Sequence, residues 1–206
     1  DFIDFNIQTT LPHKLSEYCP ALAVGDVDRN GFDDLVMGGN TFSAPTLFLQ
    51  QSNGKFVEKQ FLTKDKDILN SKDEGILLFD ANGDGNLDLY VASGGYKYDH
   101  NSANYQDMLY INDGKGNFTK AEDALPVNYT SKLSVRSTDF NNDGKPDLFV
   151  SGRVDPWNYP KPVNSFIFRN DTKNGKVKFT DVTDEVAPDL KNIGMVCDAL
   201  FTDFDN

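Results

Sequence analysis

The sequence predicts an all-β fold, specifically a β-propeller fragment of about three complete four-stranded blades with partial blades at both ends. Two observations carry this prediction. An acidic nonapeptide recurs along the chain, and a strand that begins with phenylalanine recurs in phase with it. Between these markers lie short apolar runs separated by Asn-Gly or Asp-Gly turns, and no helix of useful length is indicated.

The nonapeptide has the pattern Asp-x-Asp/Asn-x-Asp/Asn-Gly-x-x-Asp. Complete copies begin at Asp26, Asp80 and Asp139, and a fourth begins at Asp203 and stops at Asn206. The first aspartates are 54, 59 and 64 residues apart. The second marker lies 21 to 24 residues before each copy, at Phe2, Phe56, Phe118 and Phe179. Two markers in phase indicate a structural repeat rather than a chance match.

Each repeat is predicted to hold four strands. An apolar run precedes the nonapeptide, as at 21–24 and 76–79, and a second follows it, at 35–37, 87–91 and 148–150. The third run spans 46–49, 108–111 and 166–168, and the phenylalanine-marked strand is the fourth. A β-sandwich would not need the same acidic loop at the same point of every unit, so propeller blades are favoured.

The repeats also divide the chain. We assign residues 1–19 to an outer strand of a preceding blade and its connection, 20–62, 63–123 and 124–184 to three blades, and 185–206 to the start of the next blade. Because this register opens on an outer strand and closes inside the loop after an inner strand, we expect the remaining blades of a longer parent chain as partners.

Composition limits the possible functions. The chain has 206 residues with 20 Lys+Arg against 32 Asp+Glu, a formal net charge of −12, and this argues against a nucleic-acid partner. No run approaches the roughly 18 apolar residues that a membrane span needs, and the first residues lack the features of a signal peptide. Two cysteines, Cys19 and Cys197, are too few for a disulfide scaffold, and free thiols are favoured over a bridge.

The nonapeptide predicts a calcium site. Ca²⁺ takes about six to eight oxygen ligands at flexible geometry. Positions 1, 3 and 5 supply side-chain oxygen, the glycine at position 6 permits a sharp turn, position 7 offers a carbonyl and position 9 closes the shell. The candidate ligands of three full sites and a fourth incomplete one are Asp26, Asp28, Asn30, Phe32 and Asp34; Asp80, Asn82, Asp84, Asn86 and Asp88; Asp139, Asn141, Asp143, Lys145 and Asp147; and Asp203 and Asp205.

Other interpretations of these loops are weaker. An EF-hand needs glutamate at position 12 and flanking helices, whereas position 12 is Met37, Val91 or Val150 in apolar strand patterns. Magnesium is the second candidate ion but prefers smaller octahedral sites, and zinc would need His or Cys. The alternative that the loops are merely turns leaves three carboxylates per loop repelling one another.

These loops, with apolar strands on either side, resemble the FG-GAP or VCBS repeats of integrin-type β-propellers. Stretches such as Leu109–Thr119 and Ala23–Asp28 are most similar to bacterial VCBS proteins of the ASPIC/UnbV kind, which resemble the cartilage acidic protein. The resemblance implies a calcium-stabilised, mostly seven-bladed propeller in secreted or surface-exposed proteins, used for adhesion or ligand binding. The alternative location is a parent protein in the periplasm or anchored to an outer membrane.

A second candidate site lies on the opposite face of the blades. The loops between the second and third strands are long in the second and third blades and rich in residues that favour binding: Tyr96, Tyr98, His100, Tyr105, Arg153, Trp157 and Tyr159. They could form one surface for a glycan or an extracellular protein. The alternative is that the aromatic side chains pack their own loops, which prolines stiffen.

The sequence therefore favours a calcium-stabilised extracellular repeat module over an enzyme. His13 and His100 are better explained as loop residues than as catalytic bases, and no nucleophile motif or pair of glutamates stands out. The alternatives are the propeller part of a carbohydrate-active enzyme, a polysaccharide lyase or hydrolase, because fold alone does not decide function, or a purely structural repeat.

Overall fold

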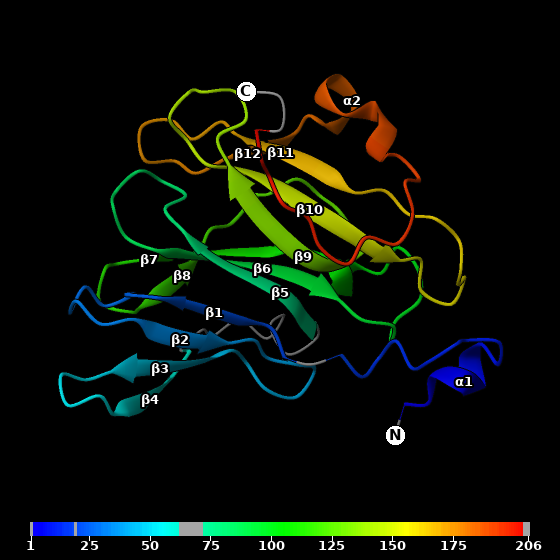
Figure 1. Ribbon diagram of the computed structural model, residues 1–206, viewed down its shortest axis with the longest axis horizontal. Helices are drawn as coiled ribbons and strands as arrows, with labels where there is room; N and C mark the ends of the chain where they lie inside the picture. Colours follow the sequence, from blue (N-terminus) through cyan, green and yellow to red (C-terminus); the bar gives the residue numbers. More distant parts are fainter. Residues whose placement is uncertain (1, 19, 62–71, 204–206) are drawn as a thin grey trace.

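The computed structural model describes residues 2–18, 20–61 and 72–203. Twelve strands form in this part of the chain (Figure 1), and they fall into three groups of four. The first group is β1 (Leu22–Gly25), β2 (Asp34–Met37), β3 (Thr46–Gln50) and β4 (Phe56–Gln60). The second is β5 (Lys72–Phe79), β6 (Asp88–Gly94), β7 (Met108–Asn112) and β8 (Phe118–Lys120). The third is β9 (Ser131–Thr138), β10 (Asp147–Val154), β11 (Phe166–Asn170) and β12 (Phe179–Asp181).

Within each group, successive strands pair antiparallel in chain order. The second and third groups are joined into one continuous sheet by a single parallel contact between Gly94 of β6 and Lys132 of β9. The first strands β1, β5 and β9 also contact their neighbours in the adjacent groups. This is the arrangement of consecutive β-propeller blades, so the predicted all-β fold is confirmed.

The second blade shows why these residues form buried strands. Its β6 is buried along its whole length, because one face packs on the first blade and the other on the third. Leu89 and Val91 belong to the apolar cluster shared with the first blade, whereas Tyr90 and Ala92 belong to the cluster shared with the third. A strand covered on both faces carries a continuous apolar run instead of alternating with polar residues.

The N-terminal segment departs from the prediction. The outer strand expected from Phe2 is not formed, and Asp4–Ile7 make the one-turn helix α1. The phenylalanine marker at Phe2 predicted a strand, but no described strand pairs with residues 2–7. Asp4 is instead fully buried, and its Oδ2 accepts hydrogen bonds from the amides of Leu15 and Ser16 at 2.5 and 2.9 Å. Satisfying these amides fixes the turn.

The C-terminal segment also differs from the prediction. After β12 come the one-turn helix α2 (Thr183–Val186) and a 3₁₀ turn at Pro188–Leu190, and residues 195–203 form no strand where an inner strand was expected. An inner strand needs a paired second strand, and no described segment supplies one. The segment instead crosses the outer face of the third blade (Figure 1), where Phe201 makes an edge contact with Phe149.

Predictions from the sequence also concerned membrane-spanning helices and the two cysteines. No helix among the described residues is long and apolar enough to cross a bilayer. Cys197 is exposed, whereas Cys19, Asp205 and the expected blade boundary at residues 62–63 lie outside the described residues.

Candidate functional site

The three nonapeptides form the loops between the first and second strands of the three blades, and the loops fold alike. In the first, the carboxylate of Asp26 accepts hydrogen bonds from the amides of Asn30 and Gly31 at 3.0 and 2.9 Å. Asp80 and Asp139 make the same pair of bonds, at 2.8 to 3.1 Å. The carboxylate at position 1 therefore points into its own loop in every blade.

The glycine at position 6 permits this geometry. Gly31, Gly85 and Gly144 have φ values of 88°, 81° and 84°, in the left-handed region that favours glycine. The residue at position 3 caps the turn from the other side, because the side-chain oxygens of Asp28, Asn82 and Asn141 each accept the amide of position 5. Repeated side-chain to backbone bonds of this kind shape a tight loop.

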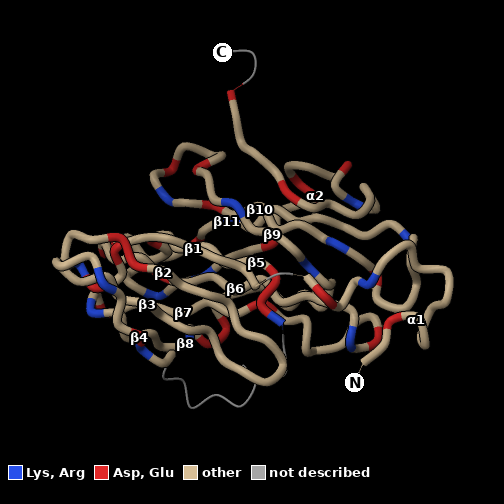
Figure 2. The backbone as a smooth tube through the Cα atoms, turned by 60° about the horizontal axis from the view of Figure 1, so that its bottom comes forward, with Lys and Arg blue, Asp and Glu red and all other residues tan. Residues whose placement is uncertain are grey.

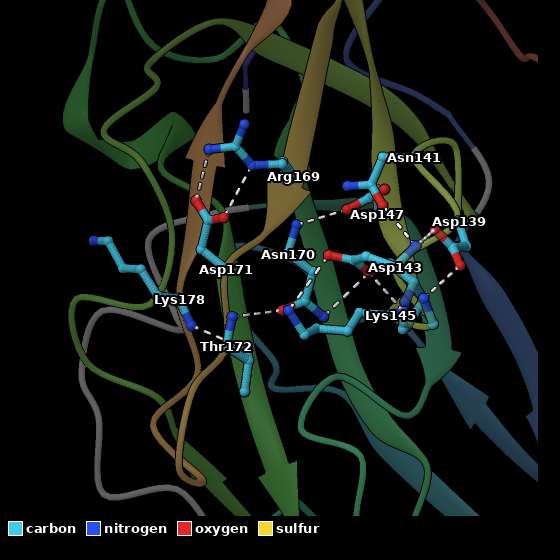
Figure 3. Close-up of polar contacts among 12 residues, drawn as sticks. Asp139, Asn141, Asp143, Lys145, Asp147, Arg169, Asn170, Asp171, Thr172 and Lys178 are labelled. Atoms are coloured by element: carbon cyan, nitrogen blue, oxygen red, sulfur yellow. Dashed lines mark hydrogen bonds and ion pairs between the residues drawn. The ribbon is translucent and has the colours of Figure 1, made fainter.

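The aspartate at position 9 ties each loop to the rest of its blade. Asp34, Asp88 and Asp147 are fully buried. One oxygen of each accepts the amide of position 2, at 2.9, 3.0 and 3.3 Å, and the other accepts the amide at the end of the third strand, at 2.8, 2.9 and 2.7 Å. Figure 3 shows this arrangement in the third blade, where Asn170 donates to Asp147.

Burial raises the pKa values of these aspartates, so they are weaker acids than an exposed aspartate. Desolvation raises the pKa of Asp88 to about 6, against hydrogen bonds from Asn112 and Ala81 that lower it, and the neighbouring Asp84 and Asp80 raise it further. The pKa values of Asp34 and Asp147 are raised for the same reasons. Each loop therefore holds a buried carboxylate whose charge is unfavourable next to other carboxylates.

The donor set fits a hard divalent cation. In the first loop, the carboxylate oxygens of Asp26, Asp28 and Asp34 all lie within 4.8 Å of one another. Acidic residues mark the turn beside β1 and β2 in Figure 2. Among the described residues, the first loop is the one where three carboxylates converge so closely. In the second loop, Asp84 accepts a hydrogen bond from the amide of Asn82. In the third loop, Asp143 pairs with the ammonium group of Lys145.

The remaining predicted ligands are placed as follows. Asn30 uses its side chain within the fold, because its Oδ1 accepts from Phe32 and its Nδ2 donates to the carbonyl of Gln50. The residues at position 7, whose carbonyls were predicted to bind, lie two positions before the second strand of each blade: Phe32, Asn86 and Lys145. Asp203 is exposed near the end of the described chain.

Two asparagines that the motif analysis missed link consecutive blades. Asn112 donates from Nδ2 to the carbonyl of Val27 in the preceding blade at 2.8 Å and to Leu87 in its own loop at 3.0 Å. Asn170 repeats this with Ala81 and Pro146 at 3.0 and 3.2 Å. The signal was present in the sequence, since both asparagines precede an aspartate at the same point of their repeats, Asn112-Asp113 and Asn170-Asp171.

A buried ion pair joins the second and third blades, and no sequence pattern indicated it. Lys132 is fully buried, with its Nζ 3.2 Å from Oδ1 of Asp107, which also accepts from the hydroxyl of Tyr90 at 2.7 Å on its other oxygen. Lys132 donates as well to the carbonyls of Tyr105 and Asn128. Burial raises the pKa of Asp107 and lowers that of Lys132, and each partner opposes the shift of the other.

The predicted aromatic surface is largely packed within the loops. Tyr96 and Tyr105 are fully buried, and their hydroxyls donate to Gln8 and to the carbonyl of Tyr98, both at 2.7 Å. Trp157 remains 37% exposed while its Nε1 donates to the carbonyl of Tyr96 at 3.2 Å. Buried tyrosines shape this end of the molecule, and the exposed part of Trp157 stays available for contact.

The other members of this surface lie nearer the solvent. Arg153 donates to the hydroxyl of Tyr18 at 2.7 and 3.1 Å, and half-buried Tyr159 donates its amide to Gln8. His100 is exposed beside Asp99, with Nδ1 2.8 Å from the carboxylate. A cavity of about 180 Å³ separates the two long loops and is lined by residues that include His100, Tyr129, Asp155 and Lys161.

The fold and its loops define a class: a repeat β-propeller whose blades share an acidic turn. Comparison with known families agrees. A family model described as FG-GAP-like repeat matches residues 26–91 and 80–150, more than half of the chain. The chain therefore belongs to the FG-GAP-like repeat family. A search of curated proteins found no match.

Proposed function

We propose that the protein is a calcium-stabilised extracellular repeat module, secreted or at the cell surface, that serves adhesion or ligand binding rather than catalysis. The observation that carries the calcium part is the convergence of Asp26, Asp28 and Asp34 within 4.8 Å. The family-model matches span all three acidic loops of this chain, and this supports the same function for the second and third loops.

Calcium would relieve the electrostatic cost of the loops. Several carboxylates held together repel one another, and one of them is fully buried in every loop. A bound cation reverses this repulsion and adds binding energy that only the folded state can use. Calcium fits better than magnesium because its larger, irregular shell accepts the six to eight oxygens of a flexible loop.

Thermal melting during a calcium titration tests this proposal. We expect a large rise in melting temperature with calcium, a small one with magnesium and a fall when chelator is added.

The double variant Asp26→Asn/Asp28→Asn should lose one calcium equivalent by calorimetry, because it neutralises two of the three converging carboxylates. A matched control, Asp99→Asn/Asp189→Asn, changes the charge equally at sites outside the nonapeptide loops. A melt indifferent to calcium, magnesium and chelator would reject the assignment.

The ligand surface is proposed for the opposite end of the blades. The exposed part of Trp157, exposed His100 and the cavity between the two long loops together offer aromatic and polar contacts suited to a glycan or a peptide. We expect Trp157→Ala to weaken binding in an array of glycans and extracellular-matrix proteins, with Val127→Ala as an exposed control. Unchanged binding of a confirmed ligand would reject this surface, and cleavage of the glycan would favour the enzyme alternative.

The first blade offers a surface for a further blade of a longer parent chain. Leu22, Val24 and Phe56 are 61%, 64% and 51% exposed on one face of its sheet. Their counterparts in the second blade, Ile76, Leu78 and Phe118, pack against the first blade. We therefore propose that the open face receives another blade in the same manner.

A further inference from the structure

The loop end of the molecule contains two successive crevices between blades, and their walls are built from corresponding positions of the repeats. In the first, Asn112 of the second blade bonds to Val27 of the first. In the second, Asn170 of the third blade bonds to Ala81 of the second. Because the same bonds set the spacing of both pairs of blades, a difference in how the crevices are filled must come from side chains.

The chain itself fills the first crevice with an arginine. Arg29, at position 4 of the first loop, adopts a φ of 59°. Its Cδ lies 3.3 Å from where a Cβ on Gly114 would stand, and its Nη2 lies 3.6 Å from the corresponding point on Gly85. The side chain thus lies along glycine backbone, with its guanidinium beside the second loop. Although desolvation raises the pKa of Asp84, hydrogen bonds from Asn86 and Asn82 and the charge of Arg29 lower it.

The second crevice lacks this side chain. The residue equivalent to Arg29 is Gly83, and nothing lies within 4 Å of where its Cβ would stand. Gly144 and Gly175, on the facing loops, are equally open. The result is a cavity of about 360 Å³ lined by residues that include Phe79, Asp80, Ala81, Asn82, Pro146 and Thr172. Its lining combines apolar groups with the carboxylate and amide of the second loop.

The charge around the second crevice favours a cationic occupant. Asp80 lines the cavity. Asp143 occupies the same position in the third loop that Asp84 occupies in the second loop, beside the first crevice. One cation of the chain is already present. Lys145 replaces Asn86, and its Nζ lies 3.4 Å from Asp143 with both side chains more than a third exposed (Figure 3). An exposed lysine pair of this kind is weak, so Lys145 can turn toward the solvent when another cation enters.

We propose that the crevice between the second and third loops binds an arginine side chain of a partner protein, in the way that Arg29 occupies the first crevice. The aliphatic stem packs on Phe79, Ala81 and glycine backbone, and the planar guanidinium faces the carboxylate of Asp80 in the lining. This site adjoins the proposed calcium loops and shares Asp80 and Asp143 with them, whereas it is separate from the aromatic loops at the other end of the blades.

The test is a titration of the isotope-labelled protein with N-acetyl-arginine amide, followed by backbone amide chemical shifts in calcium buffer. We expect saturable shifts at Gly83, Gly144 and Thr172. The citrulline derivative, which has the same shape without the charge, should bind at least tenfold more weakly. Equal shifts with citrulline, shifts confined to other residues or no shift at all would overturn the proposal.

Two reciprocal variants sharpen the experiment. Gly83→Arg supplies the occupant from the chain itself and should abolish the arginine-induced shifts; Arg29 shows that this loop position accepts arginine at positive φ. Arg29→Gly should create a second site, with new shifts at Gly85 and Gly114. Unaltered titration of both variants contradicts the proposal, and the Arg29→Gly result stands even if Gly83→Arg does not fold. Repeating the titration with chelator separates this inference from the calcium proposal, because arginine binding in the metal-free protein would survive a failure of calcium binding.

Discussion

The aspartate at position 9 of each loop has a structural role that does not depend on a metal. Both oxygens of Asp88 accept buried backbone amides, from Ala81 in the loop and from Asn112 at the end of β7. Removing an acceptor from buried donors costs roughly 1–3 kcal/mol for each group left unpaired. The residue therefore connects loop and strand before any cation binds.

The first prediction separates this role from metal binding. Asp88→Ala should lower the free energy of unfolding by about 2–4 kcal/mol in chelator, because it leaves two buried amides unpaired. Asp84→Ala, at a more exposed position of the same loop, should cost much less under the same conditions. Urea denaturation of both variants in EDTA provides the measurement. Equal stability of the two variants would contradict a structural role for Asp88.

A second prediction concerns Glu74, whose side chain is 1% exposed and lies 3.0 Å from Nζ of Lys72. Desolvation raises its pKa to about 7 from the usual 4.5, although Lys72 lowers it. Because the folded state holds this proton more tightly than the unfolded state, the stabilising contribution is complete below pH 4.5 and is lost as the pH rises toward 7.

Glu74→Gln should flatten this dependence. In chelator, the unfolding free energy of the wild type should fall more between pH 4.5 and 7.5 than that of the variant, by on the order of 1–3 kcal/mol. Asp73 and Asp88, whose pKa values are raised to about 6, act in the same direction in both proteins. Urea titrations across this pH range provide the comparison. Parallel curves would show that burial does not raise the pKa of Glu74.

Among the elements, the strands inside the repeats were predictable from sequence, whereas the conformation of the N-terminal segment was not. The loops and turns fix strand positions by local chemistry, so most of the twelve strands could be located from apolar runs between acidic loops and glycine turns. The exception is β9 (Ser131–Thr138), which has only two apolar residues and for which no range was predicted. The segment at 2–7 carries the phenylalanine marker of a strand, yet Asp4 binds amides eleven and twelve residues away and a helical turn results. Local pattern cannot report such a distant partner.

The same limit applies to the candidate sites. The acidic loops followed from spacing because all their ligands lie within nine residues. Lys132 gave no signal, because a lysine in sequence indicates solvent and only the arrangement of two blades brings it to Asp107. The crevice beside Gly83 also depends on how one blade faces the next, which needs the assembled structure.

A third prediction addresses the asparagines that connect blades. Asn112→Ala should destabilise the protein by about 2–3 kcal/mol, since Nδ2 no longer reaches Val27 and Leu87. Hydrogen exchange should accelerate mainly in β1–β4. Asn170→Ala should instead accelerate exchange in β9–β12, because it breaks the bond to Ala81. Gln60→Ala, an exposed amide on β4, is the control. Identical exchange patterns for the two asparagine variants would exclude a blade-specific link.

For the whole molecule, the two outer faces are unequal. The C-terminal segment covers the outer face of the third blade, where Val196 bonds to Gly152 and Asp198 pairs with Arg136 at 2.7 Å. The outer face of the first blade keeps Leu22 and Val24 exposed. Exposed apolar sheet faces promote association. The molecule therefore has one covered outer face and one outer face with exposed apolar residues.

The fourth prediction follows from this inequality. Leu22→Lys/Val24→Lys should reduce concentration-dependent association in sedimentation experiments, because it places charge on the open face. Val127→Lys/Leu200→Lys makes the same change in net charge at exposed apolar residues elsewhere and should have little effect. Equal association of both double variants would show that the first blade does not mediate contact.

The backbone groups of Val27 and Ala81 connect consecutive repeats. Each N–H is bonded to the aspartate of its own repeat, and each C=O to an asparagine of the following repeat. Displacement of either residue therefore breaks a bond within its own repeat and a bond to the following repeat. Melting of one repeat then removes hydrogen bonds from its nearest neighbour and lowers the stability of that neighbour, as in other arrays whose units contact only adjacent units.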